Sequence, residues 1–227
     1  MSQRKGEPVS ENIVATMAAR GPEVMGVCGG FTWHDDPRRL VFMLSRYKFV
    51  AKMLAGLDHV LEIGCGDGFG TRIVAQAVKR VTGIDFDPVY IRSAVATVNP
   101  RWPANFYWHD VLEAPVQGTF DAVFALDVLE HIDQTQEERF LRNGLHGLVP
   151  HGVCIIGMPS LESQPYASAG ARMGHVNCKE QPDLKALMQK FFHNVFMFSA
   201  NDEVVHTGYS KMSHYNFVLC CGPQKAG

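Results

Sequence analysis

Glycine at every second position is the feature of this sequence whose spacing most directly indicates chemistry. The four residues are Gly64, Gly66, Gly68 and Gly70, and they follow the apolar run 60–63. Glycine reaches backbone conformations with positive φ and lets a ligand lie against bare main chain, while a helix that follows presents free N–H groups. A dinucleotide-binding loop would be spaced GxGxxG and would need glycine where Phe69 stands. The spacing therefore predicts a ligand-binding turn and makes NAD the weaker candidate ligand.

Acidic residues recur where four successive predicted strands end. They are Glu62, Asp85, Asp110 and Asp127. Ligands of open α/β sheets bind at the carboxyl ends of the strands, so four acids in register are more specific than one. Glu62 can face a cationic group, such as the amino group of a methionine-type ligand, and would repel a pyrophosphate. Asp85 lies 21 residues after Gly64 and can accept hydrogen bonds from both hydroxyls of a ribose, which indicates a nucleoside without choosing one.

The elements that must position these residues alternate between strand and helix. Uninterrupted apolar runs predict strands covered on both faces, and apolar residues at helical spacing between them predict the covering helices. A strand, helix, strand unit of this length makes a parallel pair with a right-handed crossover. We predict an α/β fold with a doubly wound, mostly parallel seven-stranded sheet, an antiparallel last strand and an N-terminal helical cap.

The domain boundaries follow from the same patterns. Residues 1–57 are expected to form the cap or lid, with a loose tail over 1–10, a helix over 11–20, a loop over 21–37 and a second helix. Residues 58–227 are expected to form the main domain. A long segment at about 160–180 follows the fifth strand and is expected to cover the substrate.

Two motifs together resemble one enzyme family. An acidic residue, any residue and then GxGxG is the first motif of the class I S-adenosylmethionine-dependent methyltransferases. The tract DVLEHI over 127–132 is similar to the fourth-strand motif of their small-molecule members, which include the ubiquinone-pathway O-methyltransferases. The resemblance implies a seven-stranded, Rossmann-like sheet, S-adenosyl-L-methionine as cofactor, and methyl transfer to a small-molecule acceptor.

The resemblance also implies roles for individual residues. Asp85 would hold the ribose, and Asp110 would take the exocyclic amino group of adenine. Phe86 and Val111 would border the adenine ring. The implied cofactor-binding residues are Glu62, Gly64, Cys65, Gly66, Asp67, Gly68, Asp85, Phe86, Asp110, Val111, Asp127 and Val128. The lid candidates are Trp33, Arg46 and Tyr47.

Histidines near the DVLEHI tract are the candidates for acid–base chemistry. A hydroxyl acceptor needs a base, and the pKa of histidine lies near the working pH. By motif position, Glu130 and His131 would stand beside the transferable methyl group, and His131 is the leading base. His175 completes the catalytic set, while His206 and His214 are second-line candidates. Several histidines together with Asp127 and Glu130 could also assemble a metal site, but no ligand spacing supports one, so no metal is predicted.

The composition limits the classes of partner. With 21 Lys and Arg against 23 Asp and Glu the net charge is −2, so we expect no nucleic-acid partner. No apolar tract approaches the roughly 18 residues of a membrane span, and no secretory signal is apparent. Six cysteines without a pairing pattern indicate a reduced, cytoplasmic protein. The expected partner is the small-molecule acceptor, and a homodimer stays open.

Several functions remain open on these residues. Methyl transfer to a hydroxyl oxygen is favoured, but N- or carboxyl-methylation is also compatible, because specificity would lie in 21–57 and 160–212, where no motif matches. Asp85 alone supports an NAD(P)-dependent oxidoreductase. A non-catalytic subunit would bind the cofactor without turnover, and no feature selects it.

Overall fold

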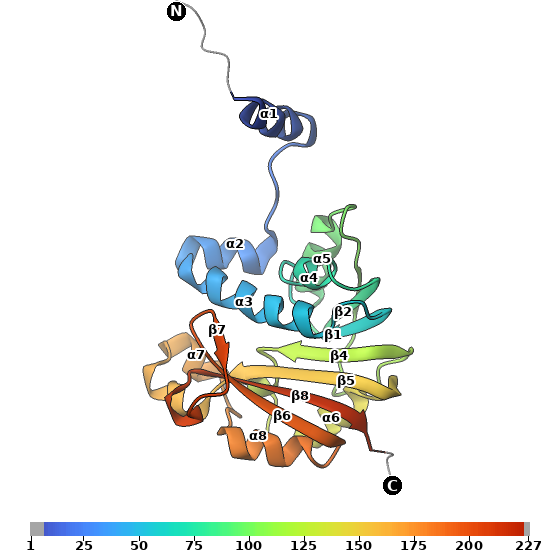
Figure 1. Ribbon diagram of the computed structural model, residues 1–227, viewed down its shortest axis with the longest axis vertical. Helices are drawn as coiled ribbons and strands as arrows, with labels where there is room; N and C mark the ends of the chain where they lie inside the picture. Colours follow the sequence, from blue (N-terminus) through green and yellow to red (C-terminus); the bar gives the residue numbers. More distant parts are fainter. Residues whose placement is uncertain (1–6, 225–227) are drawn as a thin grey trace, which may run out of the picture.

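A mixed sheet runs through the molecule in the computed structural model, which describes residues 7–224 (Figure 1). Its eight strands lie in the order β3-β2-β1-β4-β5-β8-β6-β7. The strands are β1 His59–Ile63, β2 Arg80–Asp85, β3 Asn105–Trp108, β4 Phe120–Leu126, β5 Leu148–Pro159, β6 Phe192–Asn201, β7 Val204–His206 and β8 Tyr215–Pro223. The order in which successive strands are added reverses between β1 and β4. Ligands of doubly wound folds bind at this reversal point, at the carboxyl ends of the strands.

The strand directions confirm the predicted mostly parallel sheet. Strand β1 pairs in parallel with β2 and β4, while β3 joins β2 and β5 joins β4 in the same sense. Strand β8 is antiparallel to both of its neighbours, β5 and β6. The prediction of seven strands was one short, because the three-residue β7 pairs with the end of β6. So short a run carries no periodicity that a sequence can reveal.

Helices cover both faces of the sheet. The α-helices are α1 Pro8–Arg20, α2 Gly26–Asp35, α3 Arg38–Met53, α4 Thr71–Val74, α5 Pro88–Thr97, α6 Glu137–Gly144, α7 Ala169–Gly174 and α8 Gln181–Met188. The 3₁₀ helices are η1 Leu129–His131, η2 Leu161–Tyr166 and η3 Ser210–Met212. Helix α3 packs its buried residues on one face of the sheet, and α6 and α8 pack on the other.

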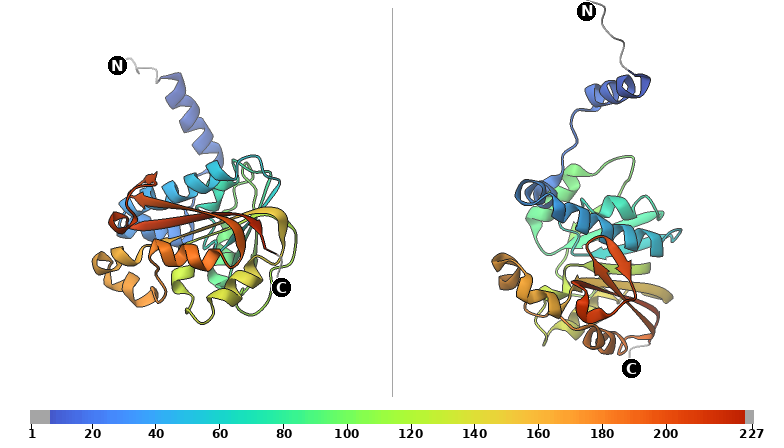
Figure 2. Two further views of the ribbon diagram at one scale, coloured as in Figure 1. Left: turned by 60° about the horizontal axis from the view of Figure 1, so that its bottom comes forward. Right: turned by 60° about the vertical axis from the view of Figure 1, so that its left-hand side comes forward.

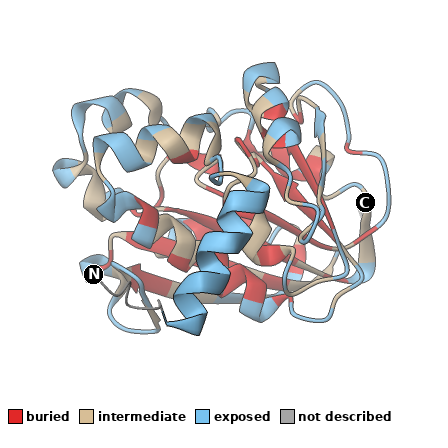
Figure 3. Ribbon diagram, turned by 90° about the horizontal axis from the view of Figure 1, so that it is seen from above, coloured by how far each residue is buried: buried red, intermediate tan, exposed pale blue. Residues whose placement is uncertain are grey.

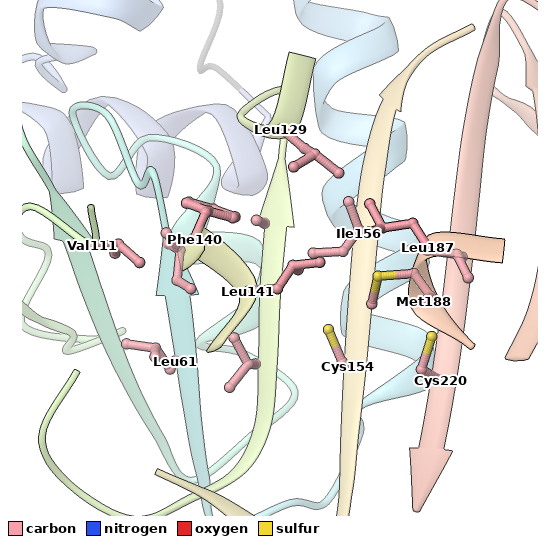
Figure 4. Packing of buried hydrophobic residues seen from close by; sticks show 14 of the residues in the cluster. Leu61, Val111, Leu129, Phe140, Leu141, Cys154, Ile156, Leu187, Met188 and Cys220 are labelled. Carbon is pink, nitrogen blue, oxygen red and sulfur yellow. The ribbon is translucent and has the colours of Figure 1, made fainter. Parts of the chain in front are cut away.

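Two apolar layers hold these helices to the sheet. On the α3 side, Val50 and Leu54 are fully buried against strand residues such as Phe124. On the other side, Leu141 and Met188 lie among strand residues, as Figure 4 shows. Figure 3 shows that burial is concentrated in the strands and on the inner faces of the helices. Burying each large side chain contributes about 1.5–3 kcal/mol, so these layers fix the strand ends that carry the acids.

The cysteines differ in their burial. All six are free thiols. Cys154 and Cys220 are fully buried in the apolar layer (Figure 4). They act as small hydrophobic residues.

Helix α1 stands apart from the body of the molecule (Figures 1 and 2). None of its residues is buried. It begins at Pro8, so the predicted tail is wrong for 8–10, while 1–6 lie outside the described residues. Within 7–224, no helix is long and apolar enough to cross a membrane. The division into a cap over 1–57 and a main domain stays a prediction, and α3 shares its buried layer with the sheet.

Helix α2 corrects the predicted loop over 21–37. Its glycines argued against a helix, since glycine costs about 1 kcal/mol in a helix interior. Here Gly29 allows close packing, because a Cβ at Gly29 would lie 3.0 Å from the ring of Phe69. The backbone N–H of Gly29 also donates to Asp67 Oδ2 at 2.8 Å. Tertiary contact therefore overrides helix propensity in this segment.

Candidate active site

The glycine loop joins β1 to α4 and takes the positive-φ backbone that its glycines predict. Gly64, Gly66 and Gly68 have φ values of +75°, +54° and +71°. Two of them are closed off by side chains: a Cβ at Gly68 would lie 2.5 Å from the Phe106 ring, and one at Gly64 would overlap Val128. A Cβ at Gly66 would meet only the sulfur of Cys28, at 3.7 Å. Gly66 is therefore the point where a ligand can approach the bare main chain.

Asp85 is held over this loop at the end of β2. Its Oδ2 accepts a hydrogen bond from the backbone N–H of Gly66 at 2.9 Å, and its Oδ1 accepts one from Asp87 at 2.9 Å. Burial raises the pKa of the carboxyl above its ordinary value, and these backbone donors oppose that rise. The carboxylate is thus oriented before a ligand arrives, beside the open glycine.

Glu62 lies inside the protein rather than at a surface. Its side chain is fully buried, with Oε1 accepting from the Tyr47 hydroxyl at 2.7 Å and Oε2 from the Thr71 hydroxyl at 2.5 Å. Burial raises the pKa of Glu62 to about 7, although both hydroxyls act in the opposite direction. Glu62 therefore ties α3 to the start of α4 beneath the loop. Its predicted contact with a ligand amino group stays a prediction.

Tyr47→Phe is expected to lower the free energy of unfolding by about 1–3 kcal/mol at pH 8.5, and by less at pH 5.5. The folded-state pKa of Glu62, about 7, is raised above the ordinary value of 4.5, so the buried carboxyl is ionised at the higher pH and protonated at the lower one. A buried carboxylate that is ionised loses more stabilisation than a protonated one when its hydrogen-bond donor is removed. Urea denaturation at both pH values measures the difference.

Tyr107→Phe is the control for that substitution. Burial raises the pKa of Tyr107, and among the described residues no charged neighbour contributes to the rise, so its hydroxyl faces no carboxylate that titrates between the two pH values. Its effect on stability should be the same at both pH values. Equal losses at both pH values in Tyr47→Phe would contradict the raised pKa of Glu62.

Asp67 docks α2 onto the loop. It is 3% exposed, and its carboxylate accepts from the N–H groups of Gly29 at 2.8 Å and Phe69 at 3.2 Å. Cys28 lies on the inner side of α2, where burial and the nearby Asp67 charge raise the pKa of the thiol to about 11. Helix α2 therefore covers the glycine loop. The predicted lid residue Trp33 is in the same helix and is 58% exposed.

The tips of β2 and β3 carry the residues implied for an adenine ring. Phe86 is 69% exposed, and the Trp108 indole donates to its carbonyl at 2.7 Å. Asp110 Oδ1 accepts from the Leu112 N–H at 2.8 Å, as expected of a turn-forming aspartate. Val111 lies in the buried core (Figure 4). An exposed aromatic beside Asp85 is compatible with a stacked ring, whereas Val111 faces the interior.

Asp127 occupies the turn after β4 and pairs with Arg46. Arg46 Nη1 lies 2.8 Å from both carboxylate oxygens, and the guanidinium stacks 3.9 Å above the Tyr215 ring. Asp127 has φ +57°, a conformation that costs a non-glycine residue about 1–3 kcal/mol unless its surroundings hold it. The next residue, Val128, packs over Gly64. The Arg46 pair thus fixes the turn that covers the glycine loop.

The three predicted catalytic side chains converge at the end of this turn. Glu130, His131 and His175 each offer one ligand-type atom, and these atoms lie within 4.8 Å of one another. The two imidazole ring centroids are 5.2 Å apart. The backbone carbonyl of Glu130 accepts from Val176 at 2.8 Å and Asn177 at 3.0 Å, which brings His175 to the η1 turn. Their catalytic role stays a prediction.

Electrostatics set Glu130 apart within this cluster. Burial raises the pKa of its carboxyl well above the ordinary value, the negative charge of Asp127 adds to the rise, and Arg46 opposes it. Burial also lowers the pKa of His175, as does the neighbouring His131.

The second-line candidate bases lie outside this cluster. His206 forms a hydrogen bond with Asn201 within the β6–β7 hairpin, and His214 accepts one from the Asp202 N–H.

Comparison with known proteins identifies the central segment of the chain. Residues 60–152 match a family model described as a methyltransferase domain, and this segment contains the glycine loop, Asp85 and the DVLEHI tract. The predicted resemblance of this segment to S-adenosylmethionine-dependent methyltransferases is confirmed. The predicted cofactor, S-adenosyl-L-methionine, is confirmed by the same comparisons.

Curated relatives match part of this chain. It is 35% identical over 117 residues to a probable S-adenosylmethionine-dependent methyltransferase of Mycolicibacterium smegmatis, covering 50% of this chain and 42% of the relative. It is 28% identical over 127 residues to the ubiquinone biosynthesis O-methyltransferase of Rickettsia canadensis, covering 53% and 50%. The chain therefore spans about half the length of these curated relatives.

A solved structure supports the fold over a longer stretch. The N-methyltransferase NodS of Bradyrhizobium japonicum, in complex with S-adenosyl-L-homocysteine, superposes with a TM-score of 0.60 at 22% identity. The match covers 85% of this chain and 91% of NodS. The mostly parallel sheet with antiparallel C-terminal strands is thus shared well beyond the segment matched in sequence.

The described residues fit S-adenosyl-L-methionine at two points. The backbone at Gly66 is open, since a Cβ there would meet nothing closer than 3.7 Å. The adjacent Asp85 carboxylate is 7% exposed and preoriented by two backbone donors. A carboxylate at this strand end can accept bonds from both ribose hydroxyls.

Sequence reasoning missed the residues that orient the two histidines. Gly174 O accepts from His131 Nδ1 at 2.8 Å, and Gln164 Oε1 lies 2.9 Å from His175 Nδ1. Gln164 and Gly174 belong to a segment without a recognisable motif, so no signal in the sequence indicated them. The short 3₁₀ and α-helices of 161–174 provide the positioning.

Proposed function

We propose that this methyltransferase transfers a methyl group to a hydroxyl oxygen of a small-molecule acceptor in the cytoplasm. The observation that supports the proposal is the convergence of Glu130, His131 and His175 directly after the turn in which Val128 packs over Gly64. A hydroxyl must lose its proton as it is methylated, so titratable groups at this end of the site favour oxygen as the acceptor atom. The free thiols and the net charge of −2 favour the cytoplasm and a small acceptor over a nucleic acid.

The reaction is an in-line displacement, to which the protein contributes mainly by aligning the two reactants and excluding water. When bound, S-adenosylmethionine supplies an electrophilic methyl group, whose bonding pair stays on sulfur as the acceptor oxygen forms the new bond. Asp85 and the main chain at Gly66 would position the nucleoside. The Nδ1–H of His131 donates to Gly174 O, which leaves Nε2 free to face the acceptor proton.

Binding of the cofactor is the first test. Isothermal titration with S-adenosylmethionine and S-adenosylhomocysteine is expected to show one site for each. Absence of binding to both, in a sample whose circular dichroism shows a folded protein, would defeat the proposal. Enhanced fluorescence on adding NADH would favour an oxidoreductase instead.

The acceptor atom needs a second experiment, because one relative is named an O-methyltransferase and the structural neighbour NodS an N-methyltransferase. Incubation with isotope-labelled cofactor and a fractionated cell extract should yield one labelled product. The carbon chemical shift of the labelled methyl group distinguishes a methoxy carbon from an N-methyl carbon. A labelled N-methyl product would overturn the assignment to oxygen and leave methyl transfer standing.

His131→Ala is expected to lower kcat at least about tenfold while the Kd for S-adenosylmethionine stays within about twofold, because His131 serves the acceptor and not the nucleoside. Labelled-methyl turnover and titration measure the two quantities. His193→Ala, at an exposed position of β6, is the matched control and should change neither. Unchanged turnover in His131→Ala would remove His131 from the reaction.

A further inference from the structure

The carboxylate of Glu130 is buried without a hydrogen-bond partner. Its exposed fraction is 0%, and within 7–224 neither Oε1 nor Oε2 has a donor. Glu137, the other buried glutamate nearby, contrasts with it: Oε2 of Glu137 lies 2.8 Å from Lys179 Nζ and 3.0 Å from Asn177 Nδ2. Buried carboxylates are ordinarily paired or coordinate a metal ion, since burial of a lone charge is costly. Within the described residues, no donor or cation lies within hydrogen-bond distance of the Glu130 carboxylate, and Arg46 acts on it only through its charge.

The two histidines beside Glu130 are oriented as metal ligands are. Gln164 Nε2 donates to the carbonyl of Ser160 at 3.1 Å, so Gln164 Oε1 must be the atom that faces His175 Nδ1. An acceptor opposite Nδ1 places the proton of His175 on Nδ1 and leaves the Nε2 lone pair free. The same follows for His131, whose Nδ1 faces Gly174 O. Fixing the tautomer through Nδ1–H is the usual second-sphere arrangement of metal-bound histidine.

We propose that Glu130, His131 and His175 bind a divalent transition-metal ion at the acceptor end of the site. One ligand atom from each lies within 4.8 Å of the others, a spacing that a single ion can span. Two imidazoles and one carboxylate favour Zn²⁺, Mn²⁺, Fe²⁺ or Co²⁺ over Mg²⁺ and Ca²⁺, which take oxygen ligands. Asp127 is not among the ligands, because Arg46 occupies both of its oxygens.

Three protein ligands leave coordination positions for the acceptor. This part of the inference rests on the proposed function. A hydroxyl bound to the ion loses its proton more readily, because the charge stabilises the oxyanion. The proton goes to solvent, the acceptor oxygen bonds to the methyl carbon, and the carbon–sulfur bonding pair stays on sulfur. In this arrangement His131 contributes as a ligand rather than as the base.

The main chain explains why no metal site was predicted from the sequence. Glu130 and His131 are adjacent, whereas His175 belongs to a distant segment. The Val176 and Asn177 N–H groups bind the Glu130 carbonyl at 2.8 Å and 3.0 Å and bring the third ligand into place. A Cβ at Gly174 would lie 3.2 Å from the His131 ring, so the small residue permits this close approach.

Titration of the metal-free full-length protein with Co²⁺ tests the inference through visible absorption, with neither cofactor nor acceptor present. Wild type is expected to bind one Co²⁺ with a Kd below about 10 μM and to release it to Zn²⁺. Glu130→Gln and His175→Asn should each weaken Co²⁺ binding at least about 100-fold. His193→Ala is the control and should bind as wild type does. The folding of each variant is checked by circular dichroism, which depends on neither the metal ion nor the cofactor.

The outcomes separate this inference from the proposed function. Wild type that binds S-adenosylmethionine but no Co²⁺ overturns the metal site and leaves methyl transfer standing. Wild type that binds Co²⁺ but neither S-adenosylmethionine nor S-adenosylhomocysteine supports the metal site and defeats the proposed function. Full Co²⁺ affinity in Glu130→Gln would show that the ion lies elsewhere. Should Glu130→Gln fail to fold, His175→Asn decides, because His175 lies outside the sheet and its buried layers.

Discussion

Gly64→Ala is expected to lower the free energy of unfolding by about 3 kcal/mol and to abolish measurable binding of S-adenosylmethionine. Two costs add. The φ of +75° costs a residue with a Cβ about 1 kcal/mol or more, and the added methyl group overlaps Val128, which costs about 1–3 kcal/mol. Val128 cannot simply retreat, because Arg46 holds the preceding Asp127 through both carboxylate oxygens. Urea denaturation and isothermal titration measure the two effects.

Gly56→Ala separates strain from overlap. Gly56 has φ +87°, and a Cβ there would meet nothing within 4 Å. It should therefore lose only about 1 kcal/mol and bind the cofactor normally. Equal losses of unfolding free energy in the two variants would show that the contact between Gly64 and Val128 does not contribute to stability. The proposed link between the glycine loop and the turn after β4 would then be wrong.

Local patterns made the central part of the fold predictable. The apolar runs of β1, β2 and β4 are buried on both faces, so their composition alone predicts parallel strands. The glycine spacing predicted the turn, and positive φ at Gly64, Gly66 and Gly68 confirms the need for glycine there. Each of these features depends on neighbours in the chain.

Long-range contacts explain what was not predicted. Helix α2 forms despite its glycines because Asp67, far along the chain, accepts the Gly29 N–H. The acids lie at or near the ends of strands, yet Glu62 and Asp127 have protein partners, Tyr47 and Arg46, which no local pattern indicated. A residue type and its position in a strand predict where a side chain starts. They do not predict which distant group will meet it.

Asp85→Asn is expected to raise the Kd for S-adenosylmethionine about 100-fold, or about 2.7 kcal/mol. Both carboxylate oxygens already accept backbone N–H groups, from Gly66 and Asp87, so the side chain stands in a fixed orientation at the tip of β2. Asparagine keeps one acceptor for the loop but loses the charge that strengthens bonds from ribose hydroxyls. Isothermal titration with S-adenosylmethionine, S-adenosylhomocysteine and adenosine measures the loss.

Asp87→Asn is the matched control for Asp85→Asn. Asp87 caps α5 by accepting the Val89 N–H at 2.7 Å, and asparagine caps a helix about as well as aspartate. Its Kd should stay within about twofold of wild type. All three ligands share the ribose, so Asp85→Asn should weaken them by similar factors. A loss of affinity confined to S-adenosylmethionine would place Asp85 near the sulfonium. Unchanged affinity for all three ligands would show that the nucleoside does not bind beside β2 and the open backbone at Gly66.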